Sequence, residues 1–460
     1  MSLTWSRFVQ LIILPFLYFY CLAFLLLFSP SSLCIAKGFP KPLQKADKVT
    51  QTTSGQVDMC LSCHQERPDK AHGRQVLGCY VCHLGNPLAG TPGEAHKEMV
   101  KNPGELRVAT RTCGQSGCHP KQVAWVEKSL MATNRGILST LRYYWGETEN
   151  QYEDITVNKV LIEGLKSPAV DYFRKLCATC HLGMEKGVLP GFLAKKGGGC
   201  TACHSIPDPQ KGHVQILKAV PLENCVRCHN RSGRIGLSYQ GKFESEGYGT
   251  PYQEGDLASM QLEDGRYYRP LPPDIHYEKG MVCIDCHTQK EVMGDGTYHA
   301  HMEQQVEIRC RTCHAGSSQI KKAVERQKAL ARLPEKRPIE VPDFVIQDGK
   351  VYLKGKIDKR LHPLSVPKKD QCGREVHRRL SCQACHSTWV PQCYGCHVQA
   401  DSSKTQLDKL LMKDTLGSWK EFRSLIRYET PPLGVLGLSG EESGNTGESC
   451  EEQVVVLVPG

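Results

Sequence analysis

The stretch GGGCTACH, residues 197–204, places Cys200 and Cys203 three positions apart and His204 directly after the second cysteine. The same Cys-x-x-Cys-His pattern occurs nine times in the chain of 460 residues. The other copies cover residues 60–64, 79–83, 177–181, 225–229, 283–287, 310–314, 382–386 and 393–397. Because only 18 of the 460 residues are histidine, a histidine after every pair is no accident of composition.

This spacing suits the covalent attachment of c-type haem. Two thiols three positions apart bond the two vinyl groups of one porphyrin edge, and the next residue offers its imidazole to the iron. Zinc ribbons also use Cys-x-x-Cys pairs, but they do not require histidine as the next residue. Redox-active dithiols usually occur singly. The nine repeats therefore predict nine haems.

The stretch CGQSGCH, residues 113–119, is a longer version of the same pattern. Its two extra residues can bulge outward, and Gly114 and Gly117 make that bulge easy. The alternative is a disulfide beside an incidental histidine. Counting this stretch as a tenth site predicts ten covalently bound haem c groups.

The predicted attachment and proximal residues follow directly from the ten motifs. The attachment cysteines are Cys60, Cys63, Cys79, Cys82, Cys113, Cys118, Cys177, Cys180, Cys200, Cys203, Cys225, Cys228, Cys283, Cys286, Cys310, Cys313, Cys382, Cys385, Cys393 and Cys396. The proximal iron ligands are His64, His83, His119, His181, His204, His229, His287, His314, His386 and His397. Outside the leader, Cys372 and Cys450 are left over as free thiols or as a mutual disulfide.

The N-terminus predicts export. Arg7 is the only charge before the apolar run 8–28, and Cys34-Ile35-Ala36 resembles a signal-peptidase site. Residues 1–36 are therefore expected to be a signal peptide. The alternative is an uncleaved anchor that tethers the protein to a membrane. Either reading predicts a periplasmic, extracellular or cell-surface location.

With ten motifs between residues 60 and 397, the chain resembles the multihaem c-type cytochromes, including decahaem electron-transfer proteins. This resemblance implies a mainly irregular and α-helical fold with little β-structure, built as short helices and loops around a haem-stacked core. It implies relay of electrons in anaerobic respiration or extracellular electron transfer. The implied partners are other cytochromes, membrane quinol-oxidising complexes or an extracellular acceptor. Assembly into oligomers or filaments stays open.

The resemblance also allows an enzyme, a multihaem oxidoreductase that acts on a small nitrogen or sulfur compound at a haem with an open distal site. No catalytic residue is assigned from the sequence. None of the ten motifs replaces its histidine with lysine, as the catalytic haem motif of the pentahaem nitrite reductases does.

Eight further histidines are candidates for distal iron ligands: His72, His96, His213, His276, His299, His301, His362 and His377. Eight cannot cap ten irons, so two haems need another ligand or keep an open site. Lysine, the amino terminus, a partner's histidine and methionine are the alternatives. A packing role is favoured for each methionine considered, namely Met99, Met131, Met293 and Met302.

The net charge of +10 raises the question of nucleic-acid binding. The basic residues are spread along an exported chain, so no nucleic-acid partner is expected. Haem propionates are better partners for these cations. Arg227, Arg231 and Arg234 are the sharpest candidates, with a solvated basic loop as the alternative.

The spacing of the motifs divides the chain into six regions. They are a leader (1–36), an N-terminal trihaem region (37–130), a second trihaem region (131–235), a dihaem region with a charged helix (236–330), a β-hairpin with a C-terminal dihaem region (331–400) and a partly mobile tail (401–460).

Local patterns predict a few regular elements. Residues 119–137 and 317–333 have helical periodicity. Residues 344–355 predict a β-hairpin that turns at Asp348-Gly349, whereas 232–282 predict an ordered loop. A short helix is expected from Trp419, followed by a mobile acidic stretch and the strand-like run 454–460. Whether the C-terminus is complete stays open.

Overall fold

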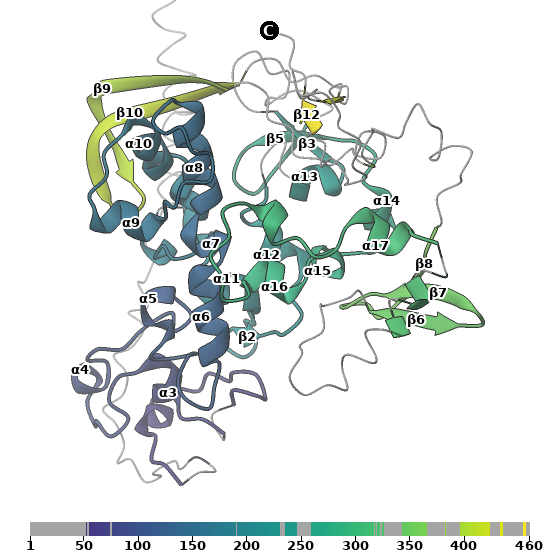
Figure 1. Ribbon diagram of the computed structural model, residues 1–460. Helices are drawn as coiled ribbons and strands as arrows, with labels where there is room; N and C mark the ends of the chain where they lie inside the picture. The colour runs from purple at the N-terminus through teal and green to yellow at the C-terminus, as the bar shows by residue number, and fades with distance from the viewer. Residues whose placement is uncertain are drawn as a thin grey trace, which may run out of the picture.

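The computed structural model describes residues 52, 55–73, 76–189, 191–230, 235–245, 259–316, 318, 320–322, 324–325, 343–365, 382, 396–423, 433–435 and 454–456. Short helices joined by loops make up most of this structure, and small sheets lie at its margins (Figure 1). Within these residues, no helix has both the length and the apolar character needed to cross a membrane.

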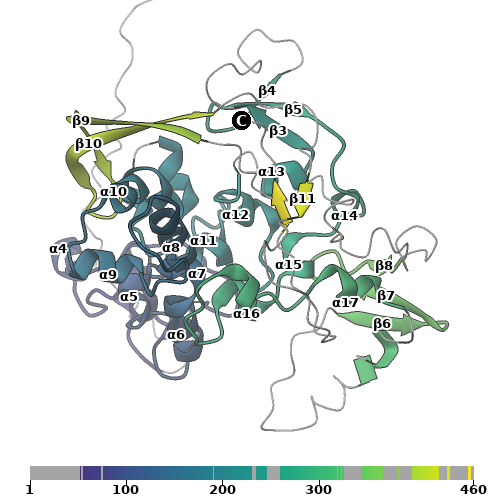
Figure 2. The same cartoon turned by 45° about the horizontal axis from the view of Figure 1, so that its top comes forward.

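Seven short helical segments carry parts of the predicted motifs. They are η2 (Met59–Ser62), α3 (Cys79–His83), η3 (Cys177–Cys180), α11 (Gly199–His204), α12 (Leu222–Val226), α15 (Cys283–Cys286) and α17 (Cys310–His314). The helices α11, α12, α15 and α17 follow one another across the molecule in both views (Figures 1 and 2). The four motifs on these helices thus lie along a line rather than around one centre.

The longest helices fill the motif-free stretch between residues 120 and 175. They are α6 (Pro120–Lys128), α7 (Leu130–Thr133), α8 (Arg135–Tyr144), α9 (Val157–Ile162) and α10 (Pro168–Lys175). Pro120 is the first residue of α6, as predicted, and the Ser129 and Ser167 hydroxyls cap α7 and α10. The predicted helical stretch 119–137 is therefore confirmed as consecutive helices.

The helical region has its own hydrophobic core. Leu138, Val160, Val170 and Phe173 are fully buried there, on α8, α9 and α10. Burying a side chain of this size contributes ~1.5–3 kcal/mol. This core gives the neighbouring motif segments a stable base.

The predicted β-hairpin is confirmed. Strands β6 (Phe344–Gln347) and β7 (Lys350–Lys354) pair antiparallel, and β8 (Leu361–Pro363) adds a third strand. Asp348 and Gly349 both have positive φ, 48° and 74°, which is the backbone that a two-residue type I′ turn requires. The described residues between 318 and 325 are helical, as predicted for 317–333, and Ile320 and Val324 pack with Val351.

The ordered loop expected over 232–282 contains regular structure instead. Helix α13 (Ile235–Tyr239) leads into a sheet in which β5 (Tyr267–Pro270) lies between β3 (Lys242–Ser245) and β4 (Met260–Gln261), and α14 (Ile275–Glu278) follows. The prediction missed the pairing of β3 with β5 because these strands lie more than twenty residues apart, so short-range pattern did not reveal it.

The short helix expected from Trp419 is wrong. Residues 419–423 belong to strand β10 (Lys413–Arg423), which pairs with β9 (Cys396–Asp408). This long hairpin crosses the boundary expected at 400/401 and lies against α10 and α8 (Figure 2). Arg174 on α10 forms a buried ion pair with Asp408, at 2.7 Å, and the rings of Trp145, Tyr172 and Trp419 pack together. Tertiary packing therefore overrides the local helical pattern.

The remaining elements are short. They are α4 (Pro92–Ala95), α5 (Leu106–Ala109), η4 (Lys186–Val188), η5 (Gly191–Lys196), β1 (Ser205–Ile206), β2 (Gln215–Ile216), α16 (Gln289–Met293), η6 (Met302–Gln304), β11 (Leu433–Val435) and β12 (Val454–Val456). The strand-like run from 454 does form a strand and pairs with β11. The expected haem-stacked core remains a prediction.

Candidate haem-binding site

The short motif turns place two thiols and an imidazole on one face. In a helical turn, residues i, i+3 and i+4 share a face, and these are the positions of the two cysteines and the histidine. The turn is closed by the histidine amide, which donates to the first cysteine's carbonyl. This bond is 2.9 Å at His64, 3.0 Å at His229 and 2.8 Å at His287. The chain itself therefore presents the three groups together.

The longer stretch CGQSGCH closes in the same way. The His119 amide donates to the Cys113 carbonyl at 2.9 Å, although two more residues separate them than in the other motifs. Gly117 has a φ of +83°, a conformation that disfavours other residues. Gly114 lies so close to Ala109 that a Cβ would come within 2.9 Å of the Ala109 carbonyl oxygen. Both glycines thus allow the bulge that the sequence predicts.

A large cavity runs past the motifs. Its volume is 5360 Å³, several times the roughly 300–1,000 Å³ of an ordinary ligand pocket. At least one cysteine of each of the first nine motifs lines it, and these lining cysteines are free thiols. The lining cysteines are Cys60, Cys63, Cys79, Cys82, Cys113, Cys180, Cys200, Cys203, Cys225, Cys228, Cys283, Cys286, Cys310, Cys313 and Cys382. The space is therefore large enough for several prosthetic groups beside their attachment thiols.

Four of the predicted distal histidines lie opposite predicted proximal histidines. The ring centres are separated by 6.0 Å for His64 and His96, 6.4 Å for His119 and His72, 6.0 Å for His83 and His213, and 5.9 Å for His314 and His276. In each pair, the second histidine comes from a segment outside the motif that it faces: His276 lies in α14, and the others lie in loops or at a helix end.

These separations fit two imidazoles on opposite sides of one iron. Metal–imidazole bonds of ~2.0 Å on both sides place the two ring centres about 6 Å apart. The planes of the paired rings meet at 53° to 90°. Such angles are compatible with ligation because each ring can rotate about its own metal–nitrogen bond. The residues present therefore fit six-coordinate haem iron at these four places.

Most of the candidate ligands hold Nδ1 in a hydrogen bond, which leaves Nε2 available for iron. The Nδ1–H groups of His83, His204 and His314 donate to the carbonyls of Val100, Leu217 and Ser365 at 2.8, 2.7 and 2.8 Å. His213 donates to the Val214 carbonyl at 2.7 Å. Metal-bound histidines typically make such a bond, because it fixes the tautomer and the ring orientation.

Other candidate ligands donate Nδ1–H to carboxylates. The bond to Glu291 from His287 is 2.8 Å long, and that to Asp274 from His276 is 2.7 Å. The Glu291 side chain is fully buried, and that of Asp274 is 6% exposed. Although burial opposes ionisation of Glu291, hydrogen bonds from His287 and from two backbone amides hold its pKa below the usual value.

More exposed carboxylates accept the equivalent bonds elsewhere. Asp69 accepts from His72 at 3.1 Å, and Glu66 accepts from His64 at 3.2 Å. Desolvation opposes ionisation of Asp69, but its hydrogen bonds with His72 lower its pKa. The candidate ligands therefore differ in the charge and burial of the groups behind them.

His181 differs from the other predicted proximal ligands. Its Nε2–H donates to the Ala132 carbonyl at 2.7 Å, while its Nδ1 is buried without a hydrogen-bond partner in the described structure. Burial lowers the pKa of His181 to about 4, so the ring is neutral. To reach an iron through Nε2, this ring must first turn away from Ala132.

Within the described part of the chain, His299, His301 and His362 show no ring contact with a motif histidine. The Nε2 atom of His299 lies 3.2 Å from Asp295. His362 is buried, and its Nε2 lies 3.9 Å from Asp358 without a hydrogen-bond partner in the described residues. His377 lies outside the described residues. Sequence position alone does not separate these three from the four that are paired.

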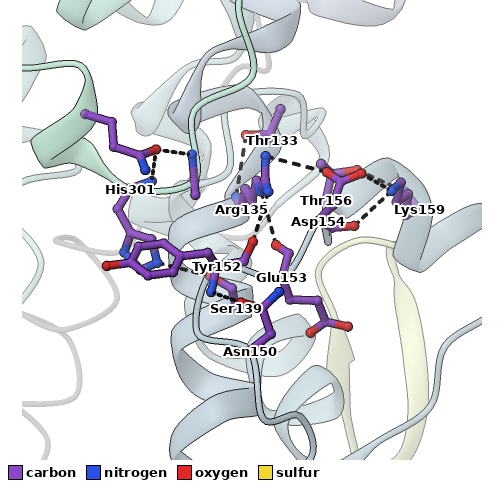
Figure 3. A network of polar contacts seen from close by, with 12 residues as sticks. Thr133, Arg135, Ser139, Asn150, Tyr152, Glu153, Asp154, Thr156, Lys159 and His301 are labelled. Carbon is purple, nitrogen blue, oxygen red and sulfur yellow. Dashed lines mark hydrogen bonds and ion pairs between the residues drawn. The ribbon is translucent and has the colours of Figure 1, made fainter.

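His301 belongs to a polar network in the helical region instead (Figure 3). Its Nε2–H donates to the Gln151 carbonyl at 2.9 Å, and its ring packs edge-on against Tyr152 at 5.1 Å. In the same network, Arg135 donates to the carbonyls of Tyr152 and Glu153. The contacts of His301 in this arrangement are those of a packing residue.

Hydrogen bonds tie the first motifs to one another in a series. The buried Asp58 carboxylate accepts from the amides of both Cys60 and Cys79, at 3.0 and 2.6 Å. Burial and this carboxylate raise the pKa of both thiols to about 12, so both stay protonated at neutral pH. Gln115, inside CGQSGCH, donates to the Val81 carbonyl of the second motif at 2.8 Å.

The next contacts join motifs that are not consecutive in the sequence. The Cys113 thiol donates to the Pro103 carbonyl at 3.8 Å and the Cys200 amide to the neighbouring Gly104 carbonyl at 2.7 Å, so the third motif lies beside the fifth. The Asn224 amide then donates to the Cys203 carbonyl at 2.6 Å and joins the fifth motif to the sixth. Cys180 of the fourth motif donates to the Cys228 carbonyl at 3.8 Å, so the fourth motif also contacts the sixth.

Beyond the sixth motif, the series follows the sequence again. The Cys225 thiol lies beside that of Cys283, and the Cys286 thiol lies near that of Cys313. The pair Cys310 and Cys382 links the eighth motif to the ninth. Among the described residues, the fourth motif therefore contacts the sixth motif but does not lie between two other motifs of the series.

The last two motifs are described only in part. Cys382 is exposed, while Cys385, His386 and Cys393 lie outside the described residues. The backbone of Cys396 and His397 is extended at the start of β9, unlike the helical turns of the earlier motifs.

The other predicted side chains have mixed outcomes. Met131 and Met293 pack against a buried cluster as expected, whereas Met99 and Met302 are exposed, so a core role for those two is wrong. Arg227 lies at the end of α12. Arg231, Arg234, Cys372 and Cys450 lie outside the described residues.

Two buried lysines among the motif cysteines were not found from the sequence. Lys186 is 1% exposed, and its amine has no hydrogen-bond partner within the described structure. Lys196 is also buried and donates to the Arg227 carbonyl at 2.6 Å. Neither lysine stands at a motif spacing, and only the fold buries them beside the fourth and sixth motifs.

Helical turns with two free thiols and an imidazole, arranged along one cavity with a second imidazole opposite, resemble the haem sites of multihaem c-type cytochromes as a class. No known family profile matches the chain, and no solved structure matches it.

One curated relative is the dissimilatory sulfite reductase MccA of Wolinella succinogenes, which is 27% identical over 187 residues. The match covers 33% of this chain and 24% of that protein, so the chain spans about a quarter of the relative's length.

Proposed function

We propose that this protein is an exported decahaem c-type cytochrome that relays electrons between redox partners. The observation that carries the proposal is the placing of four imidazole pairs about 6 Å apart beside attachment thiols. Bound haem c supplies one-electron redox chemistry. The chain attaches the porphyrin through cysteine pairs, fixes each imidazole through its Nδ1 hydrogen bond and covers the group from water.

The contacts between motifs support a relay in a definite order. The path runs through motifs 1, 2, 3, 5, 6, 7, 8 and 9, and motif 4 is attached to motif 6. Attachment thiols that touch bring the edges of successive porphyrins close together. Electrons pass between groups at such spacing by tunnelling, and the protein sets the distance and the potential of each group.

The ligand assignments belong to this proposal. His96, His213, His72 and His276 are the distal ligands of the first, second, third and eighth motifs. His299, His301, His362 and His377 stay as candidates for other haems, although His299 and His301 must first leave their present hydrogen bonds.

The location and partners follow from the same reading. The protein is exported through its N-terminus to the periplasm or cell surface. There it exchanges electrons with other cytochromes, with membrane quinol-oxidising complexes or with an extracellular acceptor, in anaerobic respiration or extracellular electron transfer. Nucleic acid is no partner.

The second candidate function is a multihaem oxidoreductase that acts on a small sulfur or nitrogen compound. Two observations favour it. The relative is a sulfite reductase, and no second imidazole is in ring contact with His181, His204 or His287 in the described part of the chain. A haem without a sixth protein ligand can bind a small molecule at its iron.

Three measurements on the purified holoprotein test both functions. Intact mass is expected to show ten covalent haems, and a mass without haem would reject the proposal. A redox titration is expected to be reversible and broad, with mostly low-spin spectra; a high-spin majority contradicts the relay. A ligand-accessible high-spin minority, together with turnover of sulfite, nitrite, hydroxylamine or tetrathionate, establishes the enzyme.

A further inference from the structure

Glu291 is held rigidly behind the imidazole of His287. One carboxylate oxygen accepts the His287 Nδ1–H at 2.8 Å, and the other accepts the amides of Glu307 and Ile308 at 2.5 and 3.1 Å. The Glu291 side chain has no exposed surface. Water therefore does not screen its negative charge from the ring.

Asp274 has the same relation to His276. Its oxygen accepts the ring Nδ1–H at 2.7 Å and the His276 backbone amide at 2.8 Å, and its side chain is 6% exposed. His276 faces His314 of the eighth motif. The seventh and eighth motifs, which are neighbours, are thus both backed by buried carboxylates.

The second motif differs. His83 and His213, which face each other, donate Nδ1–H to the neutral carbonyls of Val100 and Val214. His204 of the fifth motif also donates to a carbonyl, that of Leu217. Motifs before the seventh that use a carboxylate, through Glu66 or Asp69, use a more exposed one.

We infer that Glu291 and Asp274 are positioning residues that lower the reduction potentials of the seventh and eighth haems and create a low-potential step in the relay. A carboxylate acceptor makes an imidazole a stronger electron donor to its metal. Its negative charge also favours the ferric state, which carries one more positive charge than the ferrous state. Both effects lower the potential.

This step has a consequence for electron flow. Electrons that enter through the N-terminal motifs meet the low-potential pair before they reach the ninth motif. They therefore collect on the motifs before the seventh until a strong donor, or a fast acceptor beyond the step, moves them onward. The inference rests on the proposed function, because it requires haem at both motifs.

The test compares Glu291→Gln and Asp274→Asn with the wild-type holoprotein by spectroelectrochemical titration. Both changes remove a charge but keep an oxygen acceptor, and Asn also keeps the N-cap of α14. Each variant is expected to move one low-potential component to a more positive potential and to change one low-spin EPR signal. The matched control is Glu307→Gln, because Glu307 bonds Thr288 and Lys290 in the same network.

The outcomes separate this inference from the proposed function. Titrations that superimpose on the wild type in both variants, with a full haem count, overturn the inference and leave the relay intact. A shift to more negative potential also overturns it. If one variant loses its haem, the other still decides, since the two carboxylates act on different motifs. A wild-type protein without haem refutes the proposed function itself.

Discussion

At the residue scale, the cysteine motifs predict the proximal histidines but not their distal partners. The proximal histidines are predicted from their place after each cysteine pair, since attachment of the porphyrin leaves the next residue under its ring. The distal partners are not predictable in this way. His213 lies far from His83 in sequence, yet the fold brings their rings to 6.0 Å.

Removing one distal histidine tests this pairing. In His213→Ala, the second haem is expected to lose its sixth ligand, so about one tenth of the total haem becomes high-spin and binds carbon monoxide. EPR and carbon monoxide difference spectra measure this fraction. Gln210→Ala, at an exposed position in the same loop, is the control and is expected to keep the wild-type spectrum. Equal spectra for both variants would contradict the pairing.

At the scale of elements, the sequence predicted the turns and helix ends that depend on residues close together in the chain. The turn at Asp348-Gly349 and the start of α6 at Pro120 follow from local backbone preferences. The sheet around β5 and the hairpin of β9 and β10 were not predicted. A strand is stabilised by the strand that pairs with it, and its own sequence does not indicate which segment that is.

A buried ion pair between Arg174 and Asp408 contributes to the docking of the β9–β10 hairpin. Asp408→Ala leaves Arg174 buried without its partner, so a loss of stability of ~3–5 kcal/mol is expected. Urea unfolding of the holoprotein, followed by circular dichroism, measures it. Asp401→Ala, in an exposed part of the same hairpin, is expected to leave the midpoint unchanged. Matching midpoints for the two variants would show that the hairpin is not held by this pair.

The helical core makes a separate prediction. The Phe173 side chain is fully buried among neighbouring side chains. Phe173→Ala therefore leaves a cavity and is expected to lower the free energy of unfolding by ~3–5 kcal/mol. Thermal unfolding of the holoprotein measures the loss. Tyr144→Ala on the neighbouring helix, where the side chain is 79% exposed, is the matched control. A Phe173→Ala midpoint equal to that of the control would contradict this core.

At the scale of the whole molecule, the contacts between motifs define an order that differs from the sequence. The third motif meets the fifth, and the fourth meets the sixth. A cryo-EM structure of the holoprotein is expected to show the iron of the sixth motif flanked by those of the fourth, fifth and seventh. An iron of the fourth motif that neighbours only the third and fifth would contradict this branch.

The sequence by itself determined the spacing on which the predicted haem attachment rests, because local geometry alone brings two thiols and an imidazole within five residues to one face. It also determined that the histidines outside the motifs are fewer than the predicted irons. Only the tertiary structure decided which histidine faces which, which carboxylates are buried behind the rings, and which motifs touch. Those outcomes depend on contacts between segments that are distant in the sequence, and the spacing of residues within a motif does not predict such contacts.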